Sequence, residues 1–115
     1  MLRPGGTGIP LKDHIMQTIS KTAAIREACR HVSIQGGGTS WQIISPFYAD
    51  NLSGPSTATS ATSYFEAQAR ARSIKARIAL TLMGRLDENA DYAIYNFGHG
   101  TFDEVLDAGL KASCV

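Results

Sequence analysis

The chain has 115 residues, of which 43% are hydrophobic and 18% are charged. This length suits one domain and is too short for a large multidomain enzyme, and the composition is that of a folded protein. No apolar run approaches the roughly 20 residues of a membrane-spanning helix. Because the first residues also lack the apolar segment of a secretory signal, we expect a cytoplasmic protein.

The formal net charge of +1 hides a division of charge along the chain. Residues 1–85 contain ten Lys and Arg against four Asp and Glu, a net charge of +6. Residues 86–115 contain one Lys against six acidic residues, a net charge of −5. Such a division guides encounter with charged partners. Alternatively, the acidic segment folds back onto the basic helix and neutralises it.

The N-terminal part of the sequence predicts a lead and a first helix. Residues 1–10 are rich in Gly and Pro, which predicts a flexible lead over residues 1–15 and a single domain over residues 16–115. Apolar residues at helical spacing predict a helix over residues 20–30, with Ser20 as its N-cap. Apolar residues further upstream, Ile19 among them, extend this pattern.

Two strand-like segments follow, at residues 31–35 and 41–45, rich in β-branched and aromatic residues. Residues 36–39, three glycines and a threonine, lie between them. Because glycine permits the positive φ angles of tight turns, the sequence predicts a β-hairpin. The Ser- and Thr-rich stretch over residues 50–63 predicts a surface loop, with a short third strand at residues 57–61.

The clearest element is a long helix over residues 63–83. Ser63 and Glu66 match the capping box, in which each side chain accepts a hydrogen bond from the other residue's backbone amide, and Gly84 supplies the C-terminal stop. Apolar residues occupy two opposite faces, so we expect this helix to lie between the hairpin and the C-terminal helices. One face contains Ala67, Ala71, Ile74, Ile78 and Leu82, and the other contains Phe65, Ala69, Ala76, Leu80 and Met83.

Two shorter helices are expected over residues 87–97 and 101–112, separated by a Gly-His-Gly loop. Asp87 is the expected N-cap of the first helix, and Thr101 and Glu104 form a second capping box. The predicted order is a helix, a hairpin with a third strand, a long central helix and two short helices. We therefore expect a small α+β domain.

The sequence contains no motif that predicts catalysis or metal binding. Residues 36–40 lack the Lys of a phosphate loop, and a strand rather than a helix follows them. Cys29 and His31 lack further ligands at a zinc-site spacing, and Cys29 is expected to be a small core residue. His99, near Asp103, does not complete a nucleophile, base and acid arrangement. We therefore expect neither an enzyme nor a cofactor.

Two kinds of binding partner fit what remains. The cations of the helix over residues 63–83, with Trp41, Phe47 and Tyr48 as a stacking surface, indicate a small DNA- or RNA-binding accessory protein. Against this, the acidic C-terminal helix repels phosphate, whereas separate basic and acidic surfaces beside aromatic residues are typical of protein interactors. We expect the latter, with a larger protein or ribonucleoprotein complex as partner. The expected partner-binding residues are two helix seams (Arg70 with Arg77, and Arg72 with Lys75), the acidic Asp103, Glu104 and Asp107, and the anchors Trp41 and His99.

A resemblance points to one class of interactor. Residues 41–47 (WQIISPF), a Ser/Thr-rich loop and residues 63–71 (SYFEAQARA) at the start of a long helix resemble small phage- and plasmid-borne proteins of the anti-CRISPR class. The resemblance covers residues 31–83 and is architectural, so no functional residue is carried over. It implies a non-enzymatic inhibitor in the cytoplasm of a bacterial host. Such an inhibitor binds a multisubunit CRISPR-Cas effector and blocks DNA binding or disturbs subunit assembly.

Overall fold

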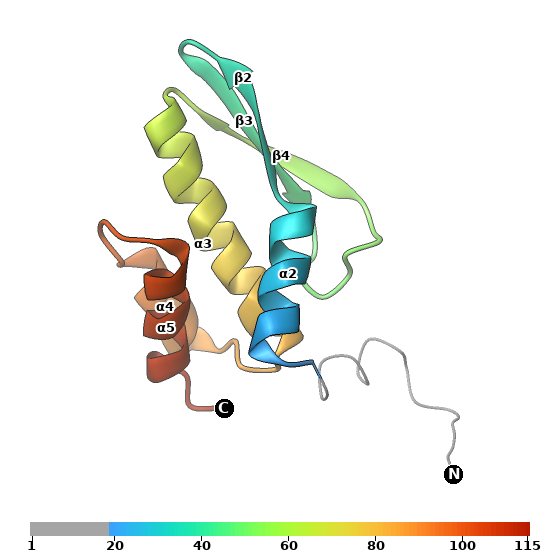
Figure 1. The fold of residues 1–115 in the computed structure, drawn as a ribbon, viewed down its shortest axis with the longest axis vertical. Helices are drawn as coiled ribbons and strands as arrows, with labels where there is room; N and C mark the ends of the chain where they lie inside the picture. Colours follow the sequence, from blue (N-terminus) through green and yellow to red (C-terminus); the bar gives the residue numbers. More distant parts are fainter. Residues whose placement is uncertain (1–18) are drawn as a thin grey trace.

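A computed structural model describes residues 19–115, which form four helices and one three-stranded sheet (Figure 1). The elements follow one another in the predicted order, and the α+β fold is confirmed. The lead expected over residues 1–15 lies outside the described residues. Within the described part of the chain, no helix is both long and apolar enough to cross a membrane.

The first described helix, α2, runs over Lys21–His31 and has the predicted N-cap, Ser20. Ile19 precedes this cap and is not helical, so the expected extension through Ile19 is wrong. His31 ends α2, which makes the prediction that it begins the hairpin wrong as well. Its imidazole Nε2 lies 3.6 Å from the Glu27 carboxylate one turn earlier, and such a pair favours helix up to this point.

The sheet has the strand order β2-β3-β4, with both pairs antiparallel. The hairpin strands are β2 (Ser33–Gly37) and β3 (Ser40–Pro46). The expected third strand is confirmed as β4, which covers Ser56–Ala61. Ile43 in the central strand is fully buried and lies opposite Ile34 of β2. Their shared face is the one that the helices cover.

The hairpin closes through a two-residue turn, Gly38 and Thr39. Gly38 has a φ of 59°, in the left-handed region that favours glycine. Gly36 lies within β2 and has a φ of 131°. A Cβ atom at this position would lie 2.3 Å from the backbone oxygen of Ser40. Since that oxygen belongs to the paired strand, glycine is required at position 36.

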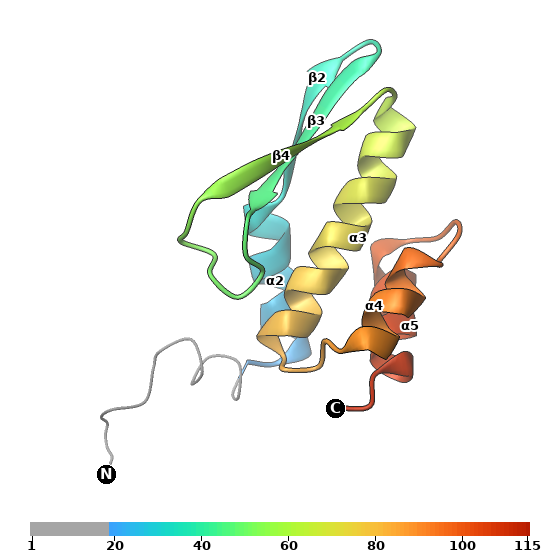
Figure 2. The ribbon, with the colours of Figure 1, turned by 180° about the vertical axis from the view of Figure 1, so that it is seen from behind.

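The long helix α3 (Tyr64–Leu82) lies between two layers, as predicted. The sheet and α2 lie on one side of it, and α4 and α5 lie on the other (Figures 1 and 2). The packing against α5 is close, since a Cβ on Gly109 would lie 2.7 Å from Leu80 Cδ1. Phe65, expected on an inward face, is 66% exposed, so that prediction is wrong. The first turn of α3 extends beyond α4 and α5, where no second layer covers it (Figure 1).

The C-terminal helices are α4 (Glu88–Tyr95) and α5 (Phe102–Ala112), each slightly shorter than predicted. Asp87 is the predicted N-cap of α4, and its Oδ1 accepts a hydrogen bond from Ala90 N at 2.8 Å. Its Oδ2 accepts another from Cys114 N, also at 2.8 Å. These two hydrogen bonds lower the pKa of Asp87, and they join the start of α4 to the segment after α5.

Of the two predicted capping boxes, one is complete and one has a different partner. Thr101 and Glu104 exchange both hydrogen bonds at the start of α5, as predicted. At the start of α3, Ser63 Oγ accepts a hydrogen bond from Glu66 N at 3.0 Å. The Glu66 carboxylate, however, accepts from Thr62 N and Thr62 Oγ1 rather than from Ser63 N. Thr62 offers two donors where the Ser63 backbone offers one.

Replacement of Gly36 by Ala tests the hairpin geometry. The new Cβ would collide with the backbone of Ser40, so we expect the free energy of unfolding to fall by about 1–3 kcal/mol. Gly37→Ala is the matched control, because a Cβ at position 37 meets no heavy atom within 4 Å. Equilibrium urea unfolding measures both variants. Equal stability of the two variants would contradict the geometry described for the turn.

Candidate functional site

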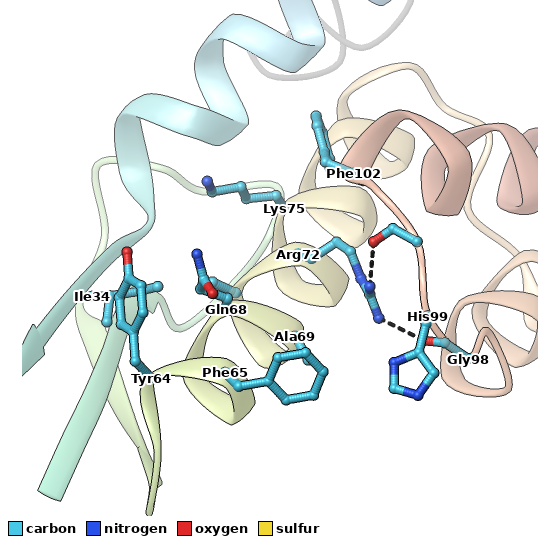
Figure 3. A pocket seen from close by; sticks show the side chains of 12 residues that line it. Ile34, Tyr64, Phe65, Gln68, Ala69, Arg72, Lys75, Gly98, His99 and Phe102 are labelled. Atoms are coloured by element: carbon cyan, nitrogen blue, oxygen red, sulfur yellow. Dashed lines mark hydrogen bonds between the residues drawn. The ribbon is translucent and has the colours of Figure 1, made fainter. Parts of the chain in front are cut away.

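Arg72 fixes the loop between α4 and α5 onto the central helix (Figure 3). Its Nη2 donates a hydrogen bond to Gly98 O at 3.0 Å, and its Nη1 donates another to Gly100 O. The guanidinium also lies over the Phe97 ring, 5.8 Å from the ring centroid. Hydrogen bonds from a charged donor are stronger than neutral ones. This predicted partner-binding residue therefore has a structural role.

Two further cations of α3 are also bonded within the chain. Arg70 Nη2 lies 2.8 Å from the Glu66 carboxylate, one turn earlier on the same helix. Arg77 forms an ion pair with Asp91 of α4. Lys75 makes no hydrogen bond or ion pair with any described residue. Of the four cations on α3, Lys75 therefore has its donors free in the part of the chain that the structure describes.

The acidic residues of α5 do not pair with the cations of α3. Asp107 pairs with Lys21 at the start of α2, at 2.9 Å, and Glu104 accepts the capping hydrogen bond from Thr101 N. Asp103 is exposed and makes no hydrogen bond within the described range. The acidic segment thus neutralises the basic helix only in part, through the single ion pair between α3 and α4.

A groove of about 520 Å³ opens beside α3, between the hairpin and the α4–α5 loop (Figure 3). We call it the α3 groove. Tyr64 and Phe65, from the first turn of α3, line it and are 50% and 66% exposed. The imidazole of His99 lies 5.8 Å from the Phe65 ring. The described residues that line the groove include three aromatic rings, counting Phe102, and no Asp or Glu.

The α3 groove brings together three of the predicted binding residues, Arg72, Lys75 and His99. Trp41, a fourth, lies behind the groove, because its ring centroid is 4.9 Å from that of Tyr64. The indole Nε1 donates a hydrogen bond of 2.8 Å to a carbonyl of the hairpin turn. Trp41 is therefore half-buried and supports the Tyr64 ring.

The other predicted binding residues do not line this groove. Arg70 and Arg77 line a second groove, of about 560 Å³, to which Arg72 also contributes. Asp103, Glu104 and Asp107 line neither groove. The structure therefore divides the predicted residues among several surfaces and gathers three of them at each of the two grooves, with Arg72 shared between the grooves.

The expected stacking surface of Trp41, Phe47 and Tyr48 is wrong. Trp41 lies near the turn end of β3, whereas Phe47 and Tyr48 follow its other end. A seven-residue strand separates them by about 20 Å. The exposed rings of Phe47 and Tyr48 pair with each other instead, with centroids 4.7 Å apart.

The prediction that Cys29 lies in the core is also wrong, because its side chain is exposed on α2. Ala24 and Ala28 are fully buried and occupy the inward face of the helix. Cys29 follows Ala28 and is turned about 100° away from that face. Among the described residues, no group of three or more His, Cys, Asp and Glu could hold a metal ion.

Tyr64, Phe65 and Gln68 of the groove were not among the predicted binding residues. The apolar spacing assigned Phe65 to a buried face of the helix. The unequal lengths of the helices could have revealed the exposure of Phe65. The helix α3 has 19 residues, whereas its neighbours α4 and α5 have 8 and 11. One end of α3 must therefore extend beyond them and expose its side chains.

No family model, curated protein or solved structure matches this chain. The function is therefore argued from the chemistry of the groove and from the state of its charges.

The hydrogen bonds at Glu66 predict how stability depends on pH. Bonds from Arg70 and Thr62 lower the pKa of Glu66 from 4.5 to about 2. Because the folded pKa is below the ordinary value, this stabilisation is present above about pH 4.5 and is lost as the pH falls toward about 2. We expect Glu66→Gln to lower the melting temperature at pH 7 and to reduce its decline in acid.

Circular dichroism melting curves between about pH 7 and 2 measure this effect. Glu88→Gln is the control, since Glu88 is exposed and makes no hydrogen bond within the described range. A Glu66→Gln variant whose melting temperature follows the wild-type pH profile would contradict the assignment.

Arg72→Lys tests the attachment of the α4–α5 loop. Lysine retains the charge but lacks the planar fork that reaches both Gly98 O and Gly100 O. We expect a loss of about 1–3 kcal/mol in the free energy of unfolding and faster amide hydrogen exchange in this loop. Arg70→Lys, at an exposed ion pair, is expected to cost less than about 1 kcal/mol. Similar effects of both variants on stability and exchange would contradict the role of Arg72.

Proposed function

We propose that this chain is a non-enzymatic protein-binding inhibitor and that the α3 groove contacts its partner. One observation carries the proposal: the large exposed side chains at the groove, Tyr64 and Phe65, are aromatic, whereas most cations of α3 are bonded within the chain. Aromatic residues are enriched at the centres of protein interfaces, where they contribute much of the binding energy. Tyr64 and Phe65 present such rings, the first against Trp41 and the second near His99.

The contacts of Tyr64 and of the loop that carries His99 favour a groove that is already formed before the partner binds. Trp41 packs behind Tyr64, and Arg72 holds the loop that carries His99. The first turn of α3 is itself fixed by the hydrogen bonds of its N-cap, Ser63. A surface whose side chains are already ordered loses less conformational entropy on binding.

The alternative, a DNA- or RNA-binding protein that uses helix 63–83 and the hairpin, receives less support. Affinity for nucleic acid increases with the number of phosphates that Lys and Arg neutralise. Of the α3 cations, three donate to groups within the chain and one, Lys75, has free donors among the described residues. Trp41 near the start of β3 and Phe47 and Tyr48 after its end are also far apart, which interrupts a base-stacking surface.

The partner class follows from the resemblance to anti-CRISPR proteins. A multisubunit CRISPR-Cas effector in a bacterial cytoplasm presents protein surfaces around its nucleic-acid channel. We propose that the chain docks on one of these surfaces and blocks DNA binding or disturbs subunit assembly. A domain of 115 residues is large enough to cover a standard interface of about 800 Å² on each partner.

Phe65→Ala tests this proposal. Its ring is 66% exposed, so its removal is expected to leave the core intact while weakening partner binding at least about tenfold. Biolayer interferometry against purified multisubunit CRISPR effectors measures binding, and a target-DNA binding assay measures inhibition. Tyr92→Ala is the matched control, because Tyr92 is 71% exposed and does not line the α3 groove.

Each result has a defined meaning. Binding that Phe65→Ala weakens and Tyr92→Ala does not would support the proposal. Equal effects of the two variants would contradict the assignment of the groove. Absence of binding to all effectors tested, with salt-dependent binding of free DNA, would overturn the proposal in favour of the nucleic-acid alternative.

A further inference from the structure

The charged groups that line the α3 groove carry one sign. Arg72 and Lys75, three residues apart on α3, both line it, together with the titratable His99. Two acidic side chains lie near the groove without lining it: Glu66 accepts from Thr62 and Arg70, and Glu104 accepts from Thr101 N beside Gly100. A concave surface with cations and without acids attracts an anionic group of a partner.

Lys75 is the member of this set whose donors are free. Arg72 already donates to Gly98 O and Gly100 O. Lys75 is half-buried, and its ammonium group has three donors that no described residue accepts. Figure 3 shows the polar ends of Lys75 and Gln68 on the same side of α3. The groove therefore offers a position for one carboxylate.

The apolar part of the groove extends from this position along α3 toward its first turn. Tyr64, near Ile34, and Phe65, pointing toward His99, lie at the first turn of α3, about 15 Å before Lys75 along the helix axis, and the half-buried Phe102 lines the groove from α5 (Figure 3). A volume of about 520 Å³ is that of a small ligand pocket and holds a few side chains. A ligand that fills the whole groove therefore needs an apolar side chain for the aromatic rings and a negatively charged side chain for Lys75.

We infer that the α3 groove binds an acidic segment of the partner protein. An aromatic or aliphatic side chain of that segment packs against Phe65 and Tyr64, and an Asp or Glu about four or five residues further along the extended segment pairs with Lys75. The inference rests on the proposed function and specifies the chemistry of its partner. A groove with one free cation and three aromatic rings can pair with a single carboxylate. A chain of phosphates would instead require several cations in a row.

Defined probes test this inference on the full chain by fluorescence anisotropy. The first is a labelled 15-residue peptide in which Asp and Glu alternate with Phe and Leu, and the second has Asn and Gln in place of the acids. The third is a 15-nucleotide oligothymidylate. We expect the acidic peptide to bind at least about tenfold more tightly than the neutral one, because its carboxylate pairs with a half-buried cation.

Substitutions at Lys75 connect the peptide to the groove. Lys75→Gln is expected to weaken binding of the acidic peptide at least about fivefold while leaving the neutral peptide unaffected, and Lys75→Arg to restore binding. Since Lys75 has no partner among the described residues, these changes leave the fold undisturbed. Lys111→Gln, at an exposed position of α5 outside the groove, is the control and is expected to change neither affinity.

The outcomes separate the inference from the proposed function. Equal affinity for the two peptides, no binding of the acidic peptide at millimolar concentration, or an acidic-peptide affinity unchanged by Lys75→Gln would each overturn the inference. If Phe65→Ala still weakens effector binding in that case, the proposed function stands without it. Preference for oligothymidylate over the acidic peptide would overturn both.

Discussion

The hydrogen bonds of Arg72 fix the α4–α5 loop against the central helix. Its guanidinium reaches from the central helix to the carbonyls of Gly98 and Gly100 and lies over Phe97. The sheet and the other helices pack on α3 through apolar side chains, whereas the α4–α5 loop contributes only the half-buried Phe97 to this apolar packing. The planar guanidinium of arginine presents its donors in a fixed fork, so that one side chain reaches both carbonyls. The wall of the α3 groove that carries His99 depends on them.

Because most cations of α3 are bonded within the chain, fewer of them are free to bind a partner. A helix that is basic in sequence has most of its charge paired in the fold, through Glu66, Asp91 and the loop carbonyls. Exposed pairs of this kind contribute little to stability, about 1 kcal/mol or less. Their effect on recognition is larger, since they remove free cations from the helix surface. The groups of the α3 groove that remain free to contact a partner include the aromatic rings and the ammonium group of Lys75.

The predictable features are those with local causes. The α+β order, the third strand, the N-caps and the two-layer burial of α3 follow from spacing and capping chemistry within a few residues. The partners of Arg72 lie 26 and 28 residues away in sequence, so no local pattern reveals them. Phe65 matches the core spacing, yet it is exposed because its neighbours in space are shorter helices. The Glu66 carboxylate accepts hydrogen bonds from Thr62 rather than from Ser63 N, because Thr62 offers two donors and the Ser63 backbone offers one.

The most direct test of this account is NMR spectroscopy of the arginine side chains. The account predicts that the Arg72 guanidinium protons exchange slowly with water and show scalar couplings across hydrogen bonds to the carbonyl carbons of Gly98 and Gly100. Arg26, exposed and without a hydrogen bond in the described part of the chain, serves as the reference for a free guanidinium. An Arg72 side chain that rotates and exchanges as fast as Arg26 would contradict the account, since the groove would then lack a fixed wall.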